Sequence, residues 1–286
     1  MRLLVPAKIN LHLRIGPPMA DGFHPLLTWM CTVGLYDTLD VSAQTAVSRQ
    51  VTLACSDPQL PTDGRNLVVK AAHAFLDAFS VNATVCAALQ KRIPAGGGLG
   101  GGSSDAAAML MGLRRIFGRG GSDGVLSPLA VRLGSDVPFF LQGPSAICSG
   151  KGEIVRPITP PAPPWAMLLT PSFGVSTPEV YRRFDEMGLG REENVTAEPD
   201  WQSWSVLPAA ELMEKLINDL ETPAFAVAPE LEVLRSECEE RLGRVVRMSG
   251  SGSTLFTLYD GRAEAERDLE KIVSAKVGSV IVELTP

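Results

Sequence analysis

The first fifteen residues carry an alternation of apolar and polar side chains. Between Leu3 and Ile15, apolar positions 11, 13 and 15 alternate with polar positions 10, 12 and 14. A period of two residues is typical of a β-strand with one buried face, and Gly16-Pro17-Pro18 ends this pattern. The alternation places the side chains of Lys8 and Asn10 on the same face of the predicted strand.

The rest of the chain mixes strand and helix periodicities, which predicts an α+β fold. Strands are predicted at 37–42, 51–54, 81–89, 165–170, 244–248, 255–259 and 279–284, and apolar residues alternate over 81–89. Helices are predicted at 66–79, 103–117, 127–133, 178–187, 207–220, 229–242 and 263–274; apolar residues have helical spacing over 66–79, and Ser127-Pro128 is typical of a helix start. Residues 191–203 are predicted to form a polar loop, and no internal repeat is visible.

Prolines break the pattern near the middle of the chain. The segment Pro157-Ile158-Thr159-Pro160-Pro161-Ala162-Pro163-Pro164 cannot continue a helix or a central strand, because proline lacks a backbone N–H. We therefore expect a domain boundary here, with an N-terminal domain of residues 1–156 and a C-terminal domain of residues 165–286.

The composition favours a folded protein with a sizeable core, because 45% of the 286 residues are hydrophobic. The net charge of −6 argues against general nucleic-acid binding, although Lys91-Arg92 is a local basic site that suits phosphates. Five scattered cysteines and three histidines form no zinc motif and fit a reducing compartment. The strand pattern begins close to Met1 and no apolar run has membrane-spanning length, so we expect a cytoplasmic protein.

A glycine-rich segment between a predicted strand and a predicted helix is the strongest candidate for chemistry. Glycines lack a Cβ and adopt positive φ, so successive backbone N–H groups can turn toward one anion. The following helix adds the positive end of its dipole. The segment predicts a site for the phosphates of a nucleotide triphosphate, formed by Pro94, Gly96, Gly97, Gly98, Gly100, Gly101, Gly102, Ser103 and Ser104.

Spacing separates two common kinds of glycine loop from this one. A Walker A loop needs a lysine directly after its last glycine, and here Ser103 follows Gly102, which excludes that class. A Rossmann fingerprint is formally matched by glycines 96, 98 and 101. Its context disagrees, because Lys91 to Pro94 separates the strand from the glycines and a second glycine-rich stretch, 118–124, occupies the place of the next strand.

Three segments together resemble the ordered motifs of the GHMP small-molecule kinases. They are Pro6-Ala7-Lys8-Ile9-Asn10-Leu11, the glycine-rich segment up to Ala107, and Met248-Ser249-Gly250-Ser251-Gly252-Ser253-Thr254. The resemblance spans nearly the whole chain. It implies a two-domain α+β fold with mixed or antiparallel sheets and packed helices, and an active site in the cleft between domains. It also implies ATP and Mg²⁺ as cofactors, with ATP bound by the N-terminal domain and the substrate on the side of the C-terminal domain.

Within that superfamily, residues 21–26 and 133–140 most resemble the kinases of the non-mevalonate isoprenoid pathway that phosphorylate the 2-hydroxyl of a cytidine-diphosphate-linked methylerythritol. Two alternatives stay open. One is a kinase for another small alcohol, such as a sugar, a mevalonate-like acid or homoserine. The other is a non-catalytic nucleotide-binding sensor of the same fold. We expect a small-molecule substrate, no nucleic acid or membrane partner, and a monomer or homodimer.

Lys8 and Asp136 are the candidate catalytic residues. Lys8 is a cation in an apolar strand pattern, and Asp136 is a carboxylate in a Gly-Ser-Asp-Val-Pro turn beside two phenylalanines. Phosphoryl transfer needs a group that accepts the hydroxyl proton and a cation that neutralises the transferred oxygens. The resemblance implies that Asp136 is the base and that Lys8 orients it and stabilises phosphate charge. A structural Lys–Asp ion pair is the alternative.

The resemblance also implies how the acceptor substrate binds. Asn10 would hold the acceptor hydroxyl, and Phe23-His24 would bind the cytosine by stacking and edge hydrogen bonds. Tyr181 would oppose them from the second domain. The structural alternatives are a polar strand residue for Asn10, an exposed loop histidine for His24 and a core position for Tyr181.

The remaining candidates lie near the nucleotide and the third motif. Asn66 would lie beside adenine, although it also suits a helix N-cap. Ser103 and Ser104 are expected to cap the following helix and to reach phosphate oxygens or Mg²⁺. Asp105 would repel phosphates, so we assign it no ligand. Ser251, with its glycine neighbours, is expected to approach the phosphates or the substrate diphosphate. Trp201 and Trp204 are expected to cover hydrophobic surface or form an oligomer contact.

Overall fold

The computed structural model describes residues 1–119, 123–272 and 277–284, which group into two compact units. The first unit comprises Met1–Ala7, Leu35–Ala95 and Gly100–Gly143. The second comprises Lys8–Gly34, Gly96–Leu99 and Pro144–Pro286. The chain therefore passes between the units several times, whereas the proline-rich segment predicted a single crossing. The division into functional domains 1–156 and 165–286 stays a prediction.

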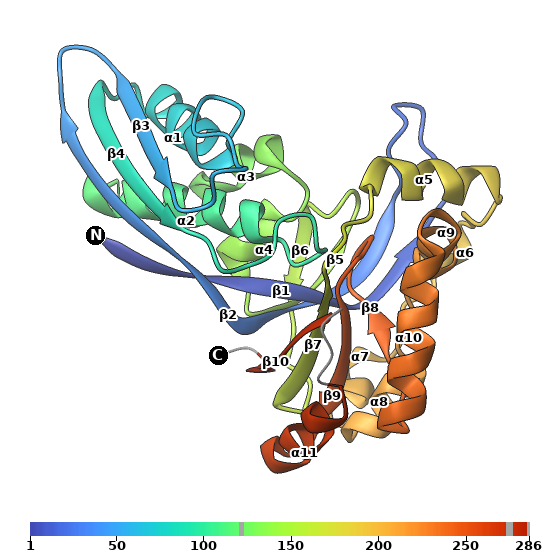
Figure 1. Ribbon diagram of the computed structural model, residues 1–286. Coiled ribbons are helices and arrows are strands. Elements are labelled where there is room, and N and C mark those ends of the chain that lie inside the picture. Colours follow the sequence, from blue (N-terminus) through green and yellow to red (C-terminus); the bar gives the residue numbers. More distant parts are fainter. Residues whose placement is uncertain (120–122, 273–276, 285–286) are drawn as a thin grey trace. The chain divides into compact units, whose positions relative to one another are not determined.

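The first unit packs helices against part of a mixed sheet. Strand β2 (Leu26–Thr45) pairs antiparallel with β4 (Ala83–Gln90) over its C-terminal residues, and β3 (Gln50–Cys55) pairs parallel with β4. Helices α1 (Leu67–Ala78), α2 (Gly101–Ile116), α3 (Ser127–Leu133) and α4 (Val137–Gln142) belong to this unit, together with the short 3₁₀ turn η1 (Asp123–Val125). Figure 1 shows α1 beside α2 and next to β3. One hydrophobic core joins the apolar faces of these helices and strands.

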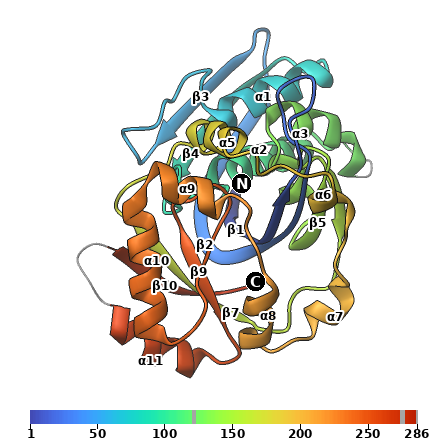
Figure 2. The same ribbon diagram turned by 90° about the vertical axis from the view of Figure 1, so that its right-hand side faces the viewer.

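The second unit contains an antiparallel sheet with strand order β10-β7-β9-β8. Its strands are β7 (Trp165–Pro171), β8 (Arg247–Met248), β9 (Leu255–Tyr259) and β10 (Val277–Glu283). The N-terminal residues of β2 also pair here with β5 (Ser145–Ser149), which pairs with β6 (Ile154–Pro157). Helices α5 (Thr177–Glu186), α6 (Glu193–Thr196), α7 (Trp201–Ser205), α8 (Ala209–Lys215), α9 (Glu221–Val227), α10 (Pro229–Leu242) and α11 (Arg262–Ile272) complete this unit. Figure 2 shows α10 and α11 on one side of β7 and β9.

The long strand β1 (Arg2–Ile15) pairs with β2 and confirms the strand predicted at the start of the chain. Burial does not alternate along it, because every residue from Ala7 to Leu13 is buried. Most other predicted elements are also present. Three predictions are wrong in detail: strand 37–42 is the end of a much longer strand, strand 244–248 keeps only two residues, and loop 191–203 contains α6 and the start of α7. Short strands β5 and β6 and helix α4 were not predicted.

The predicted helix 207–220 is wrong in its second half. Helix α8 ends at Lys215, and the following residues pair with β1 instead. The Leu13 amide donates to the carbonyl of Ile217 at 2.8 Å, and the Asp219 amide donates to the carbonyl of Leu13 at 2.9 Å. An adjacent strand thus offers these residues backbone partners that compete with the helical bonds.

Trp201 and Trp204 form part of a ring cluster in the second unit. Trp201 is buried, and both tryptophans lie 5.5 Å from the buried ring of His12 between ring centres. Trp29 packs against Trp201 at 5.8 Å. The expectation of an oligomer contact is therefore wrong for Trp201, whose ring contributes to the interior. No helix in the described residues is long and apolar enough to span a membrane.

Candidate active site

The glycine-rich segment turns through three glycines with positive φ before it enters α2. Gly96, Gly98 and Gly100 have φ of 72°, 75° and 69°, a region that favours glycine. Helix α2 begins at Gly101 with Gly100 as its N-cap, and no side chain caps it. Ser103 and Ser104 therefore lie inside the first turn and are not caps, which corrects the sequence-based expectation. The uncapped N–H groups of this turn form the kind of site that binds anions.

In the second unit, Lys8 and Asn10 lie against the glycine-rich segment. The Lys8 ammonium is buried and donates to Asn10 Oδ1 at 2.5 Å and to the Gly98 carbonyl at 3.1 Å. Asn10 Nδ2 donates to Thr28 Oγ1 at 2.9 Å. The prediction that Lys8 and Asn10 share one face of β1 is confirmed, and both side chains are held within a polar network.

The third motif, which runs from Met248 to Thr254, also contacts the Gly98 carbonyl. Ser249 Oγ donates to the Gly98 carbonyl at 3.0 Å and accepts from the Asn10 amide at 3.1 Å. A Cβ on Gly98 would lie 2.2 Å from the Ser249 carbonyl oxygen, so only glycine fits this approach. We call Lys8, Asn10, Gly98, Ser249 and the nearby Asn218 the Gly98 network. Asn218 Nδ2 donates to the carbonyls of Met248 and Gly250, each at 2.8 Å.

The small residues after Ser249 face the segment that leads into α5. Ser251 and Thr177 share a hydrogen bond of 2.6 Å between their hydroxyls, and Ser253 Oγ donates to the Phe173 carbonyl at 2.8 Å. The hydroxyl of Thr254 is buried and has no hydrogen-bond partner among the described residues. Ser251 is thus fixed by α5, and its contact with substrate stays a prediction.

Asp136 belongs to the first unit, where it is the half-buried N-cap residue of α4. A Cβ on Gly134 would lie 4.0 Å from Ser103 Oγ, so the turn that carries Asp136 lies beside the first turn of α2. Lys8 belongs to the second unit. The contact between Lys8 and Asp136 therefore stays a prediction, whereas the proximity of the Asp136 turn to the uncapped helix start is observed.

His24 and Tyr181, which were predicted to oppose each other at the cytosine, are in direct ring contact, and their binding role stays a prediction. Their rings lie 5.2 Å apart between centres, and His24 is buried and not an exposed loop residue. Its Nε2 lies 2.7 Å from Asp185 Oδ1. Sequence analysis missed Asp185, although it follows Tyr181 by four residues and so shares its face of α5. Phe23 is 56% exposed, with the Lys151 ammonium 4.6 Å from its ring centre.

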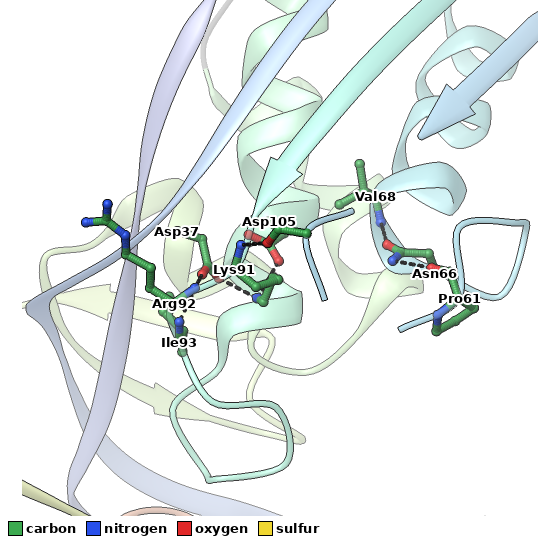
Figure 3. A network of polar contacts seen from close by, with 9 residues as sticks. Asp37, Pro61, Asn66, Val68, Lys91, Arg92, Ile93 and Asp105 are labelled. Carbon is green, nitrogen blue, oxygen red and sulfur yellow. Dashed lines mark hydrogen bonds and ion pairs between the residues drawn. The ribbon is translucent and has the colours of Figure 1, made fainter. Parts of the chain in front are cut away.

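Asn66 acts as the N-cap of α1. Its Oδ1 accepts from the Val68 amide at 2.9 Å, and its Nδ2 donates to the Pro61 carbonyl at 2.8 Å (Figure 3). The capping interpretation is therefore confirmed. Its proximity to adenine stays a prediction.

Lys91 does not form the surface basic site that the sequence suggested. Its side chain is only 7% exposed and is ion-paired with Asp37 and, at 2.9 Å, with Asp105 (Figure 3). Burial is the largest cause that raises the pKa of Asp105, to about 7; Lys91 opposes this shift and Asp37 adds to it. Asp105 thus contributes to a buried charge cluster, which sequence analysis did not predict.

Within the described residues, no group of three or more His, Cys, Asp or Glu side chains could hold a metal ion. This matters for the expected Mg²⁺. In nucleotide enzymes this ion is held largely by substrate phosphates and water with few protein ligands. A site near the Ser103 hydroxyl fits that pattern.

Family models and full-length relatives agree on what the chain resembles. The GHMP kinase N-terminal domain model matches residues 66–144, and the GHMP kinase C-terminal model matches residues 206–277. A 4-diphosphocytidyl-2-C-methyl-D-erythritol kinase of Nocardioides sp. is 39% identical over 97% of this chain and 94% of its own length. A protein of the same name from Protochlamydia amoebophila is 37% identical over 93% of this chain and 86% of its own.

Solved structures support the same assignment. A crystal structure titled 4-(cytidine 5'-diphospho)-2C-methyl-D-erythritol kinase is 36% identical, covers 99% of both chains and has a TM-score of 0.79. A mevalonate kinase, 13% identical with a TM-score of 0.69, shares the fold. The two-domain GHMP α+β fold class predicted from the motifs is thus confirmed. The chain belongs to the GHMP kinases and, among them, to the 4-diphosphocytidyl-2-C-methyl-D-erythritol kinase family.

Proposed function

We propose that the protein transfers the γ-phosphoryl group of ATP to the 2-hydroxyl of 4-diphosphocytidyl-2-C-methyl-D-erythritol. The observation that carries the mechanism is the buried Lys8 ammonium, 3.1 Å from the Gly98 carbonyl of the glycine-rich segment. A buried cation beside such a segment suits a reaction in which negative charge develops on a transferred phosphoryl group. The choice of acceptor is supported by the names of the full-length relatives.

In the proposed reaction, the acceptor oxygen forms a bond to the γ-phosphorus while the bond from this phosphorus to the β,γ-bridging oxygen breaks. ADP leaves with that electron pair, and the hydroxyl proton moves to the carboxylate of Asp136. Lys8 balances charge on the transferred oxygens and orients Asp136. Asn10, whose Oδ1 is held by Lys8 and whose amide group is held by Thr28, would position the acceptor hydroxyl.

ATP would bind with its phosphates at the uncapped start of α2. The N–H groups of the uncapped first turn, the half-buried Ser103 and the turn that carries Asp136 all lie at this point in the first unit. Mg²⁺, which would be carried by the phosphates near Ser103, would neutralise phosphate charge when bound. Adenine would lie near Asn66.

The cytosine would be recognised by His24 and its neighbours. In one tautomer of His24, Nε2–H donates a hydrogen bond to Asp185. Nδ1 is then unprotonated and would accept from the exocyclic amine of the cytosine. The rings of Tyr181 and Phe23 offer stacking surfaces from separate segments of the second unit. Asp185 would act indirectly, because it fixes the orientation of His24.

A substrate comparison tests this proposal. ADP release is measured with the cytidylyl substrate, free methylerythritol, homoserine and mevalonate, and phosphorus NMR locates the new phosphate. We expect kcat/KM for the cytidylyl substrate to exceed that of the other alcohols by about a hundredfold or more, because hydrogen bonds to the base are lost without it. A preference for an uncytidylated alcohol would refute the proposed acceptor, and absence of turnover with every alcohol would favour the sensor alternative.

A further inference from the structure

A cluster of buried charges in the first unit has no role in the proposed chemistry. Asp37 is fully buried and accepts from the amides of Arg92 at 2.5 Å and Ile93 at 2.9 Å, in addition to its ion pair with Lys91. Asp105 is also buried, and among the described residues Lys91 donates to its Oδ2 at 2.9 Å. The second carboxylate oxygen of Asp105, Oδ1, has no partner among the described residues. Burying charge in this way is costly, so the cluster requires an explanation.

The cluster lies directly behind the uncapped start of α2. A Cβ on Gly101, the first residue of the helix, would be 3.1 Å from the Lys91 ammonium and 2.9 Å from Ile93 Cγ2. Figure 3 shows Asp105 on α2 and Asp37 on β2 converging on Lys91 at the end of β4. A cation at this end of a helix is unfavourable with the helix dipole. It becomes favourable when an anion binds to the same turn.

We propose that Lys91 is a positioning residue for the phosphate-binding turn of α2, that Asp37 anchors its ammonium group, and that Asp105 sets the net charge of the cluster. This inference rests on the proposed binding of ATP at that turn. Lys91 acts through its close packing against Gly101. Ile93, which also packs against Gly101, is fixed by the hydrogen bond from its amide to Asp37.

The two carboxylates have different tasks because their surroundings differ. Asp37 has three donors and remains the anchor, whereas Asp105 has one donor and an unpartnered oxygen. Lys91 from the end of β4 and Asp37 from β2 are the charged groups that face Asp105. With Asp105 ionised the cluster carries a charge of about −1, and with Asp105 protonated it is about neutral. The neutral cluster should favour a polyanionic ligand, so ATP binding should favour the protonated form.

The test measures nucleotide affinity without an acceptor. Calorimetric titration with Mg²⁺ and a non-hydrolysable ATP analogue is carried out on the full chain and on the Lys91→Met and Asp105→Asn variants. Lys215→Met, which removes an exposed lysine of α8, is the matched control. We expect Lys91→Met to weaken binding about tenfold or more and the control to change it less than about twofold. A Lys91→Met variant that is folded and binds within about twofold of wild type would overturn the proposal.

The pH dependence separates positioning from general stability. Asp105→Asn keeps an oxygen that accepts from Lys91 but cannot ionise. The ratio of its nucleotide affinity to that of wild type should be close to one at pH 6 and rise to about three or more at pH 8, where wild-type Asp105 is charged. Taking this ratio cancels the titration of the nucleotide itself. A ratio that does not change with pH would refute the role of Asp105, and this arm decides the matter if Lys91→Met does not fold.

Kinetics with the acceptor then distinguish the two proposals. Lys91→Met should raise KM for ATP about tenfold and leave KM for the cytidylyl substrate within about twofold. If wild-type enzyme does not turn over that substrate, the proposed function fails, whereas the nucleotide-binding measurements still test Lys91. If wild type turns over but the Lys91 and Asp105 variants bind nucleotide normally, only the present inference fails.

Discussion

The two halves of the glycine-rich segment are supported in different ways. Gly96–Leu99, in the second unit, is held by the Gly98 network, in which the Lys8 ammonium and the Ser249 hydroxyl donate to the Gly98 carbonyl. The other members of the network, Asn10, Ser249 and Asn218, have uncharged side chains. The segment that begins at Gly100, in the first unit, is supported by the charged cluster of Asp37, Lys91 and Asp105. The same stretch of chain thus changes its kind of support after Leu99.

The difference teaches what each kind of support can do. Hydrogen bonds between neutral groups depend on direction and distance, so they fix a position and do not respond to pH. Buried charges act over longer distances and change with protonation, so they set an electrostatic potential. We therefore expect the Gly98 network not to tolerate a negative charge in place of the amide donor of Asn218, and the cluster to tolerate neutralisation of Asp105.

The largest effect is expected where a charge takes part in the proposed chemistry. Asp136→Asn keeps the size of the side chain but removes the carboxylate that accepts the hydroxyl proton, so kcat should fall by about two to four orders of magnitude. Single-turnover kinetics with the cytidylyl substrate measure this. Affinity for the ATP analogue should remain within about twofold, which separates lost chemistry from lost binding. Wild-type kcat in this variant would remove Asp136 as the base.

Placing a carboxylate in the Gly98 network tests whether its uncharged donors are required. Asn218→Asp replaces a group that donates to two carbonyls with an oxygen that cannot, in a buried position. The carbonyls of Met248 and Gly250 would lose their donor and face a carboxylate. The expected loss of stability is about 3 kcal/mol or more. Urea unfolding of the variant measures this loss.

The control for that experiment is Asn82→Asp. Asn82 is exposed, and its side-chain oxygen accepts from Arg49 at 3.2 Å, so the same chemical change should alter stability by less than about 0.5 kcal/mol. Equal losses at positions 82 and 218 would mean that the substitution itself, and not the network, determines the result.

Removing one hydroxyl from the network should have a smaller effect. Ser249→Ala leaves the buried Asn10 amide without its acceptor and takes one of two donors from the Gly98 carbonyl. The expected cost is about 1 to 2 kcal/mol, with a drop in kcat of about tenfold if Asn10 shifts. Ser249→Thr retains the hydroxyl and should restore kcat more than stability, because its methyl group enters a buried space. Unchanged kcat in Ser249→Ala would confine Ser249 to a structural role.

Much of the fold could be predicted because local patterns agreed with tertiary packing. The alternation in β1, the cap at Asn66 and the apolar spacing of α1 each indicate an element that the structure contains. The failures occur where a non-local partner decides. Residues after Lys215 leave the helix to pair with Leu13, and β5 forms because β2 offers an antiparallel neighbour. No local pattern carries that information.

The candidate site divides in the same way. Lys8 and Asn10 were predicted to share one face of a strand, and they do. His24 and Tyr181 were predicted to oppose each other at the cytosine, and their rings are in direct contact. Asp185 was missed because a single acidic residue on a polar helix face has many ordinary explanations. The cluster around Lys91 was missed because its three members are far apart in sequence, and a Lys-Arg pair beside a loop usually indicates exposed charge. Only the packed structure shows that these charges are buried, and burial makes them an internal charge cluster and not a surface site.

The smallest expected effect is a pH dependence of stability that differs between the two regions. Burial lowers the pKa of His12, in the second unit, to about 3, so below about pH 6.5 the unfolded chain binds a proton that the folded chain does not, and stability falls with acid. The pKa of Asp105 is raised to about 7, so the folded chain retains a proton between about pH 4 and 7, and stability falls as the pH rises through that range. The two slopes oppose each other at acidic pH.

Between pH 6.5 and 7.5 the His12 contribution fades and the Asp105 contribution is the larger of the two, so the stability of Asp105→Asn should rise relative to wild type by about 1 kcal/mol or less across this interval. Urea unfolding at closely spaced pH values measures the difference, and His12→Gln, which leaves the cluster intact, should still lose stability as the pH rises through this interval. If Asp105→Asn also runs parallel to wild type there, Asp105 does not change its charge near neutral pH. The cluster would then give no pH response that distinguishes it from the Gly98 network, and the contrast between the two halves of the glycine-rich segment would be one of geometry alone.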